Sequence, residues 1–163
     1  MSPSQSEGKL VFVPLSGELL AGFATQGNLE GPLPAFTVTD EMLDAFGLRV
    51  EDGEQAEFTA VNIAAIAGLL SFGVRLVAVL PASYVGGCDD FGTVSASGLK
   101  YSQVVSLFAD EPAGERVALI AQQLKGRTLD EVWEDPIVIE LVDDAELLWY
   151  GPAEWKQLVH LLG

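Results

Sequence analysis

The segment Asp52–Phe72 constrains the fold more than any other part of the sequence. It begins with acidic residues and continues with many alanines, a composition that favours a helix with negative charge at its amino-terminal end. From Val61 onward, apolar residues lie on nearly every side of this helix. Such a helix has to be covered all round, because a solvent-facing side would expose large aliphatic side chains. We therefore expect the helix in the middle of a domain.

The residues that follow this helix have the pattern of a buried strand. Val74–Leu80 is rich in β-branched residues, and Pro81 is expected to end the strand. A membrane span over Phe58–Pro81 is the alternative, but Asn62 and Arg75 interrupt the apolar run. The sequence favours a buried helix followed by a buried strand.

The remaining elements are short strands and short helices. We expect strands at Lys9–Leu15, Ala35–Thr39, Gly92–Ala96, Val104–Ala109 and Ile137–Val142, although the last pattern also allows the start of a helix. We expect helices capped by Ser16 and by Thr39, a helix that starts at Pro112, a turn of helix at Leu129–Trp133 and a final helix at Ala153–Leu162. This order predicts an α/β or α+β sandwich with a mixed sheet of about five strands and packed helices. One globular domain is expected over residues 9–163, after a disordered tail at Met1–Gly8.

The acidic composition limits the partners of the chain. It has 24 acidic against 8 basic residues and a formal charge of −16, a field that repels phosphate backbones and anionic lipid headgroups. We expect no direct contact with nucleic acid or membrane, and a protein partner of basic character. The single cysteine, Cys88, excludes an intramolecular disulfide, and Met1–Gly8 lacks the features of a signal peptide, so we expect a cytoplasmic protein. Homo-oligomerisation stays open, because the apolar helix could also pack across a two-fold axis.

Sequence signatures of the large enzyme classes are missing. The chain has no Gly-rich phosphate loop, no dinucleotide-binding motif, no nucleophile elbow and no HExxH zinc motif. The single histidine, His160, is interpreted as a helix-end residue. Ser97–Lys100 matches the letters S-x-x-K, but Gly98 indicates a turn. We predict no catalytic residues, no metal site and no cofactor.

Two acidic clusters are the strongest local anomaly in the sequence. The first surrounds Arg49 and consists of Asp40, Glu41, Asp44, Glu51, Asp52, Glu54 and Glu57. The second has no basic residue within its span and consists of Asp130, Glu131, Glu134, Asp135, Glu140, Asp143, Asp144 and Glu146. Neither has the spacing of a calcium loop. Each is either solvated surface or a negative face that docks a basic partner; a third interpretation is mimicry of DNA phosphates.

The aromatic residues Trp149 and Tyr150 follow the second cluster. They either hold the last helix against the sheet or act as interface contacts. The leading hypothesis is a non-enzymatic binding or regulatory protein that presents an acidic surface to a protein partner. Its predicted binding residues are Asp130, Glu131, Glu134, Asp135, Asp143, Asp144, Trp149 and Tyr150.

The alternative hypothesis is a small enzyme or small-ligand binder that uses the loop 82–100. Glycines in this loop would allow close approach of a ligand to Cys88, Asp89 and Asp90. The two adjacent carboxylates oppose the thiolate form that a nucleophilic cysteine needs. A pocket lined by the three residues would be required.

Several short stretches occur in the same order as in a known family. They are the Val13-Pro14 strand exit, the strand and cap at Phe36–Thr39, the acidic lead into Asp52–Phe72, the strand Val74–Leu80, and Glu146–Tyr150 before a terminal amphipathic helix. Through them the chain resembles an uncharacterised actinobacterial family defined only as a domain of unknown function. The resemblance covers most of the chain, and Ala82–Lys100 and Gly151–Glu154 depart from it. It implies a small cytoplasmic actinobacterial protein and supplies no activity and no catalytic residues.

Overall fold

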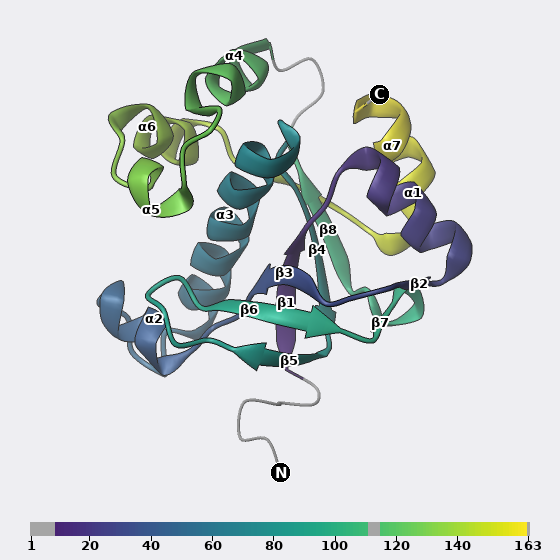
Figure 1. Ribbon diagram of the computed structural model, residues 1–163, viewed down its shortest axis with the longest axis horizontal. Coiled ribbons are helices and arrows are strands. Elements are labelled where there is room, and N and C mark those ends of the chain that lie inside the picture. Colours follow the sequence, from purple (N-terminus) through teal and green to yellow (C-terminus); the bar gives the residue numbers. More distant parts are fainter. Residues whose placement is uncertain (1–8, 111–114, 163) are drawn as a thin grey trace.

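The computed structural model describes residues 9–110 and 115–162 and is organised around an antiparallel sheet (Figure 1). From edge to edge, the seven strands of the sheet are β5 (Ser83–Gly86), β6 (Thr93–Ser97), β3 (Leu33–Phe36), β1 (Leu10–Pro14), β4 (Leu76–Pro81), β8 (Ser106–Ala109) and β9 (Leu148–Tyr150). A separate small sheet pairs β2 (Asn28–Leu29) with β7 (Leu99–Lys100). The α-helices are α1 (Gly17–Gln26), α2 (Asp40–Ala45), α3 (Gly53–Phe72), α4 (Glu115–Leu124), α5 (Leu129–Val132), α6 (Pro136–Asp144) and α7 (Trp155–Leu162). Two short 3₁₀ helices lie at Tyr101–Gln103 and Pro152–Glu154.

The predicted α+β class is confirmed, but the sheet is larger than expected. It has seven strands instead of about five, and all of its pairings are antiparallel, so it is not a mixed sheet. The two strands of this sheet that were not expected are β5, which forms a hairpin with β6 inside the expected loop 82–100, and β9 at the opposite edge. Both are short edge strands, which leave a weak pattern in the sequence.

The strand expected at Ile137–Val142 is wrong, because this segment is helix α6. The side chain of Asp135 accepts a hydrogen bond from the first turn, and Pro136 occupies the first helical position. Both are helix-start signals that the β-branched residues of the segment obscured. Val138 and Leu141, three positions apart, form the buried side of the helix.

Most of the other predicted elements are confirmed. The helices after Ser16 and Thr39 begin with the expected side-chain caps, and the helical turn after Thr128 and the final helix are present. The strand expected at Ala35–Thr39 instead spans Leu33–Phe36. Gly98 has a φ of 67°, as a turn residue should. The expected tail at Met1–Gly8 and the helix start at Pro112 lie outside the described residues.

Side chains of the two central strands alternate between two apolar layers. Val11 and Val13 of β1 point toward α1 and α7, which lie side by side on one face of the sheet (Figure 1). Phe12 and, from β4, Val77 point toward α3 on the other face. Because both faces are covered, these two strands are apolar throughout, as predicted for Val74–Leu80.

Helix α3 lies in the middle of the molecule, as its composition predicts. One side packs on the sheet, and Ile66 and Leu69 on another side pack against Leu124, Val132 and other residues of α4, α5 and α6. Among the described residues, α3 is the one helix long and apolar enough to cross a membrane. Its burial between sheet and helices is that of a core helix.

A buried ion pair joins the sheet to the helices on the α3 face. The side chain of Arg75, which precedes β4, is fully buried and makes a two-point contact with the carboxylate of Asp110. Arg75 Nη2 also donates to the backbone oxygen of Ala145 at the end of α6, at 3.0 Å. The contact fixes the connection from α6 to β9 over the end of the sheet.

Candidate functional site

Two carboxylates of the second acidic cluster are engaged in helix caps. The backbone and hydroxyl groups of Thr128 donate to Glu131 Oε1 at 2.9 and 3.0 Å, and these bonds hold the pKa of Glu131 below its usual range. Asp135 caps α6 and lies 2.9 Å from Arg127 Nη1. The backbone amide of Ile137, followed by the Arg127 side chain, lowers the pKa of Asp135. Both carboxylates stabilise local structure.

Two further carboxylates face an arginine from outside the acidic span. Arg116 Nη2 on α4 lies 3.8 Å from Glu140 Oε1 and 3.7 Å from Asp144 Oδ2, and all three side chains are exposed. Exposed pairs at such distances contribute at most roughly 1 kcal/mol. Arg116 thus partly neutralises the negative charge of a segment that contains no basic residue of its own.

The other four carboxylates of the cluster have no ion pair within the described part of the chain. They are Asp130, Glu134, Asp143 and Glu146. Asp130 and Glu134 line one pocket, Asp143 lines a shallow hollow on α6, and Glu146 lines a pocket between α3 and the sheet. Carboxylates without an internal partner are the ones that remain available to a ligand.

The pocket lined by Asp130 and Glu134, which we call the acidic–aromatic pocket, has an aromatic floor. Its volume is about 500 Å³, and its lining residues are Ala45, Phe46, Asp90, Phe91, Asp130, Trp133, Glu134 and Ile139. The rings of Phe46, Phe91 and Trp133 contact one another edge to face, with centroid distances of 6.3, 5.9 and 5.9 Å. Rings in this contact stabilise each other and together give the pocket an aromatic floor.

A tight turn before β6 positions Asp90 and Phe91, which line this pocket. Asp89 Oδ1 accepts hydrogen bonds from the backbone amides of Phe91 and Thr93, at 3.1 and 2.8 Å. Partial burial raises the pKa of Asp89, but hydrogen bonds from Thr93, Phe91 and Gly92 together outweigh this effect and lower it. Gly92 has a φ of 71°, and a Cβ there would lie 2.1 Å from the backbone oxygen of Thr37. A glycine is therefore required for the turn to approach the end of β3.

The three predicted residues of the loop 82–100 have different surroundings. Cys88 is exposed, and the carboxylate of Asp89 is occupied by the turn. Asp90 lines the acidic–aromatic pocket beside residues of the second acidic cluster. The fold thus joins Asp90 to the predicted partner surface, a proximity that sequence distance conceals.

Trp149 and Tyr150 lie next to each other on β9 but differ in burial. Tyr150 belongs to the core beneath α1 and α7, whereas 61% of Trp149 is exposed. Trp149 lies opposite Phe108 of β8 on the α3 face of the sheet. Tyr150 has the core position expected of an aromatic residue that holds the last helix, and Trp149 remains available for contact with a partner.

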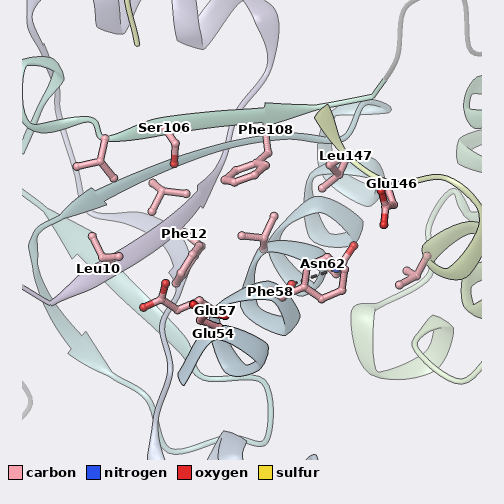
Figure 2. Close-up of a pocket in the computed structure, with 14 residues that line it drawn as sticks. Leu10, Phe12, Glu54, Glu57, Phe58, Asn62, Ser106, Phe108, Glu146 and Leu147 are labelled. Atoms are coloured by element: carbon pink, nitrogen blue, oxygen red, sulfur yellow. Dashed lines mark hydrogen bonds between the residues drawn. The ribbon is translucent and has the colours of Figure 1, made fainter. Parts of the chain in front are cut away.

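Another pocket, which no sequence motif predicts, lies between α3 and the sheet (Figure 2). We call it the helix–sheet pocket. Its volume is about 360 Å³, its walls are mainly apolar, and its polar residues are Glu54, Glu57, Asn62, Ser106 and Glu146. The sequence signal for it is Asn62, a polar residue inside an apolar helix, which by itself does not locate a pocket.

Among the residues that the structure describes, no group of three or more His, Cys, Asp or Glu side chains is arranged to hold a metal ion. His160 is exposed in the last turn of α7, across the sheet from both pockets. The two pockets offer apolar surface, carboxylates and hydrogen-bond acceptors, which suit binding through charge and shape.

Comparison with protein families identifies a matching family model. The matching model covers residues 10–159, from β1 into α7, and describes a family of unknown function (DUF6912). No curated protein and no solved structure matches the chain. The actinobacterial origin that the resemblance implies stays a prediction. Because the match spans nearly the whole fold, the chain belongs to this family of unknown function.

Proposed function

We propose that the chain is a binding protein that holds a basic segment of a protein partner at the acidic–aromatic pocket. The proposal rests on one observation: Asp90, Asp130 and Glu134, which have no ion pair among the described residues, surround a floor of contacting aromatic rings. An arginine or lysine side chain complements this arrangement. Its apolar stem can lie on the rings while its charged end meets the carboxylates.

The charge of the whole molecule supports the same class of partner. A formal charge of −16 attracts a basic surface over roughly a Debye length and accelerates its encounter with the pocket. The same field repels nucleic acid. We place this binding in the cytoplasm, and the unpaired Cys88 is consistent with a reducing compartment.

The contact surface is proposed to continue from the acidic–aromatic pocket along α6. Trp133 and Ile139 line both this pocket and the neighbouring hollow that contains Asp143. Ile139 is half exposed and adds apolar area to this proposed contact surface. In this proposal, Glu131, Asp135 and Asp144 contribute to the field but not to direct contact, because they are engaged within the chain.

The proposal is tested by affinity capture from a lysate of the source organism, with the tagged full chain and two variants. The site variant combines Asp90→Asn, Asp130→Asn and Glu134→Gln. The control combines Glu18→Gln, Glu30→Gln and Glu41→Gln, which are exposed residues outside the pocket, so that the net charge is equal. We expect one basic partner to be retained by the wild type and the control and to be lost by the site variant.

Salt and folding measurements complete the experiment. The partner should be released at about 0.3–0.5 M salt, where the Debye length falls well below 10 Å. Urea unfolding should be the same for the site variant and the wild type, because the three carboxylates make no ion pair among the described residues. A partner held equally by the site variant, or no stoichiometric partner at low salt, would contradict the proposal.

A further inference from the structure

The helix–sheet pocket lies where α3 leaves part of the sheet uncovered (Figure 2). Phe12 of β1 and Phe108 of β8 form part of its sheet side, and Val61 and Phe58 form part of its helix side. Phe58 is 57% exposed, although the pocket next to it is apolar. The volume of about 360 Å³ is within the range of about 300–1,000 Å³ that is typical of pockets for small organic molecules.

Two buried polar side chains open into this apolar space. Asn62 is 6% exposed and Ser106 is 8% exposed. Asn62 Nδ2 donates to the backbone oxygen of Phe58 at 3.0 Å, but within the described residues Asn62 Oδ1 and Ser106 Oγ have no hydrogen-bond partner. Among those residues, only Arg75 Nη1 is both unpartnered and closed off from solvent, so the two oxygens remain accessible from the pocket. Polar oxygens that are accessible on an otherwise apolar wall are acceptors with which a ligand can form hydrogen bonds.

Three carboxylates lie at the ends of the pocket. Figure 2 shows Glu54 and Glu57 together near the start of α3, and Glu146 beside Leu147 toward the other end. In the described chain none of the three has an ion pair, and no lysine, arginine or histidine lines the pocket. A ligand therefore meets acceptor oxygens and negative charge but no cation. The negative charge disfavours an anionic ligand. A wholly apolar ligand would leave the acceptor oxygens without a hydrogen-bond donor.

We propose that the helix–sheet pocket binds a small primary amine with an apolar body. The ammonium group supplies three N–H donors, which suit Asn62 Oδ1 and a carboxylate at the rim. The apolar body packs on the phenylalanine side chains of the walls, whose rings also favour a nearby cation. This site is separate from the acidic–aromatic pocket and does not depend on its function.

The test uses three probes with the same apolar body and different head groups: 4-phenylbutylamine, 4-phenylbutan-1-ol and 4-phenylbutanoic acid. Each is titrated into the ¹⁵N-labelled full chain at neutral pH and followed by two-dimensional NMR. We expect the amine to shift the side-chain amide signal of Asn62 and the backbone signal of Ser106. The amine should bind about tenfold more tightly than the alcohol, because a charge-assisted hydrogen bond replaces a neutral one. The acid should not bind.

Two variants locate the head group. Asn62→Leu keeps the size of the side chain but removes its oxygen, and should weaken the amine about tenfold while it leaves the alcohol nearly unchanged. The double variant Glu54→Gln/Glu57→Gln should weaken the amine several-fold, most strongly at low salt. The control Glu18→Gln/Glu30→Gln has the same net charge and should bind like the wild type. Urea unfolding of each variant verifies that the fold is retained.

Four outcomes of the titrations with the small probes would overturn the proposal. They are equal affinity for amine and alcohol, no binding up to millimolar concentration, shifts confined to the acidic–aromatic pocket, and unchanged amine affinity in both site variants. A lysine-containing peptide that displaces the amine and binds more tightly would also overturn it, and would assign the pocket to a side chain of a protein partner.

Discussion

The two faces of the central sheet are covered to different extents. On one face, α1 and α7 lie against each other, and Leu20, Phe23 and Leu158 complete a continuous core with the strands. On the other face, α3 packs on β1, β3 and β4, and the surface beside β8 is left partly open as the helix–sheet pocket. The first face is a closed core, and the second combines core with an open pocket.

This difference follows from how the helices cover each face of the sheet. Helices α1 and α7 are amphipathic and have one apolar side each, so two of them side by side close a sheet face. Helix α3 is apolar on several sides and is shared between the sheet and α4–α6. One shared helix covers less of the sheet, and both pockets with unpaired carboxylates lie on its face of the sheet. Incomplete coverage is thus a structural reason to place binding on the α3 face.

The largest expected contrast between the faces comes from two phenylalanines. Phe23 on α1 is 1% exposed and contacts Tyr101 edge to face at a centroid distance of 5.0 Å, whereas Phe58 on α3 is mostly exposed. Phe23→Ala should cost about 3–5 kcal/mol, because it removes a fully buried ring from a closed core. Phe58→Ala should change stability by no more than about 0.5 kcal/mol. Urea unfolding at neutral pH measures both.

A conservative change sharpens this comparison. Phe23→Leu keeps most of the apolar volume and should cost much less than Phe23→Ala. Similar losses for Phe23→Ala and Phe58→Ala would show that both faces are equally closed, against the structure.

The buried ion pair Arg75–Asp110 gives the next largest effect, because Arg75 also connects the sheet to the end of α6 on the α3 face. Asp110→Ala would leave the Arg75 guanidinium buried with the backbone oxygen of Ala145 as its remaining partner. We expect a loss of roughly 3 kcal/mol, the lower part of the range for buried pairs because Asp110 keeps some exposure. The double variant Arg75→Met/Asp110→Leu should recover most of this loss. A double variant no more stable than Asp110→Ala would show that the charges themselves are required.

A smaller loss is expected at the turn that forms one side of the acidic–aromatic pocket. Gly92→Ala places a Cβ against the backbone oxygen of Thr37 and forces a positive φ on alanine. The turn should shift, with a loss of about 1–3 kcal/mol in unfolding experiments. Gly126→Ala is the matched control, because its φ is also positive but its Cβ would meet no atom within 4 Å. Amide signals of Asp90 and Phe91 should move only in the first variant, and equal effects of the two would assign the loss to φ alone.

The fold was predictable wherever local pattern and tertiary surroundings agree. The strands β1 and β4 and the helix α3 are apolar enough that only burial suits them, and Ser16 and Thr39 cap helices through their own side chains. Strand β9 and helix α6 were not predicted, since short edge strands have little pattern and a run of β-branched residues resembles a strand. In α6 the capping residues decide the structure against that propensity.

The acidic character of the site was predictable from the sequence, but the particular residues that line the pocket were not. The sequence identifies Asp130 and Glu134 as part of an acidic cluster, but not that Arg127 and Arg116 engage other members of it. Nor does any local pattern bring Phe46 of the α2 end to Phe91 of the turn before β6. These contacts depend on tertiary structure, which spacing along the chain does not report.

The smallest expected effect concerns pH and again separates the two faces. Hydrogen bonds lower the pKa of Glu131 and of Asp135, so the folded chain binds fewer protons at these residues than the unfolded chain does at acidic pH. Their contribution to stability is therefore complete at neutral pH and is lost as the pH falls below the ordinary carboxylate range and through the lowered values. The test compares the free energy of unfolding in urea at pH 7 and at about pH 3. The variant Glu131→Gln/Asp135→Asn should lose less stability over this range than the wild type, because it lacks both hydrogen-bonded carboxylates. The control Glu134→Gln/Asp143→Asn should follow the wild type, because its carboxylates make no such bonds in the described chain. As the pH falls, amide hydrogen exchange should rise in α5 and α6 before it rises in α1 and α7. The reason is that the charged caps Glu131 and Asp135 stabilise the starts of α5 and α6. Equal acid sensitivity of both variants, or simultaneous opening of all four helices, would show that the two faces respond to protonation as one unit.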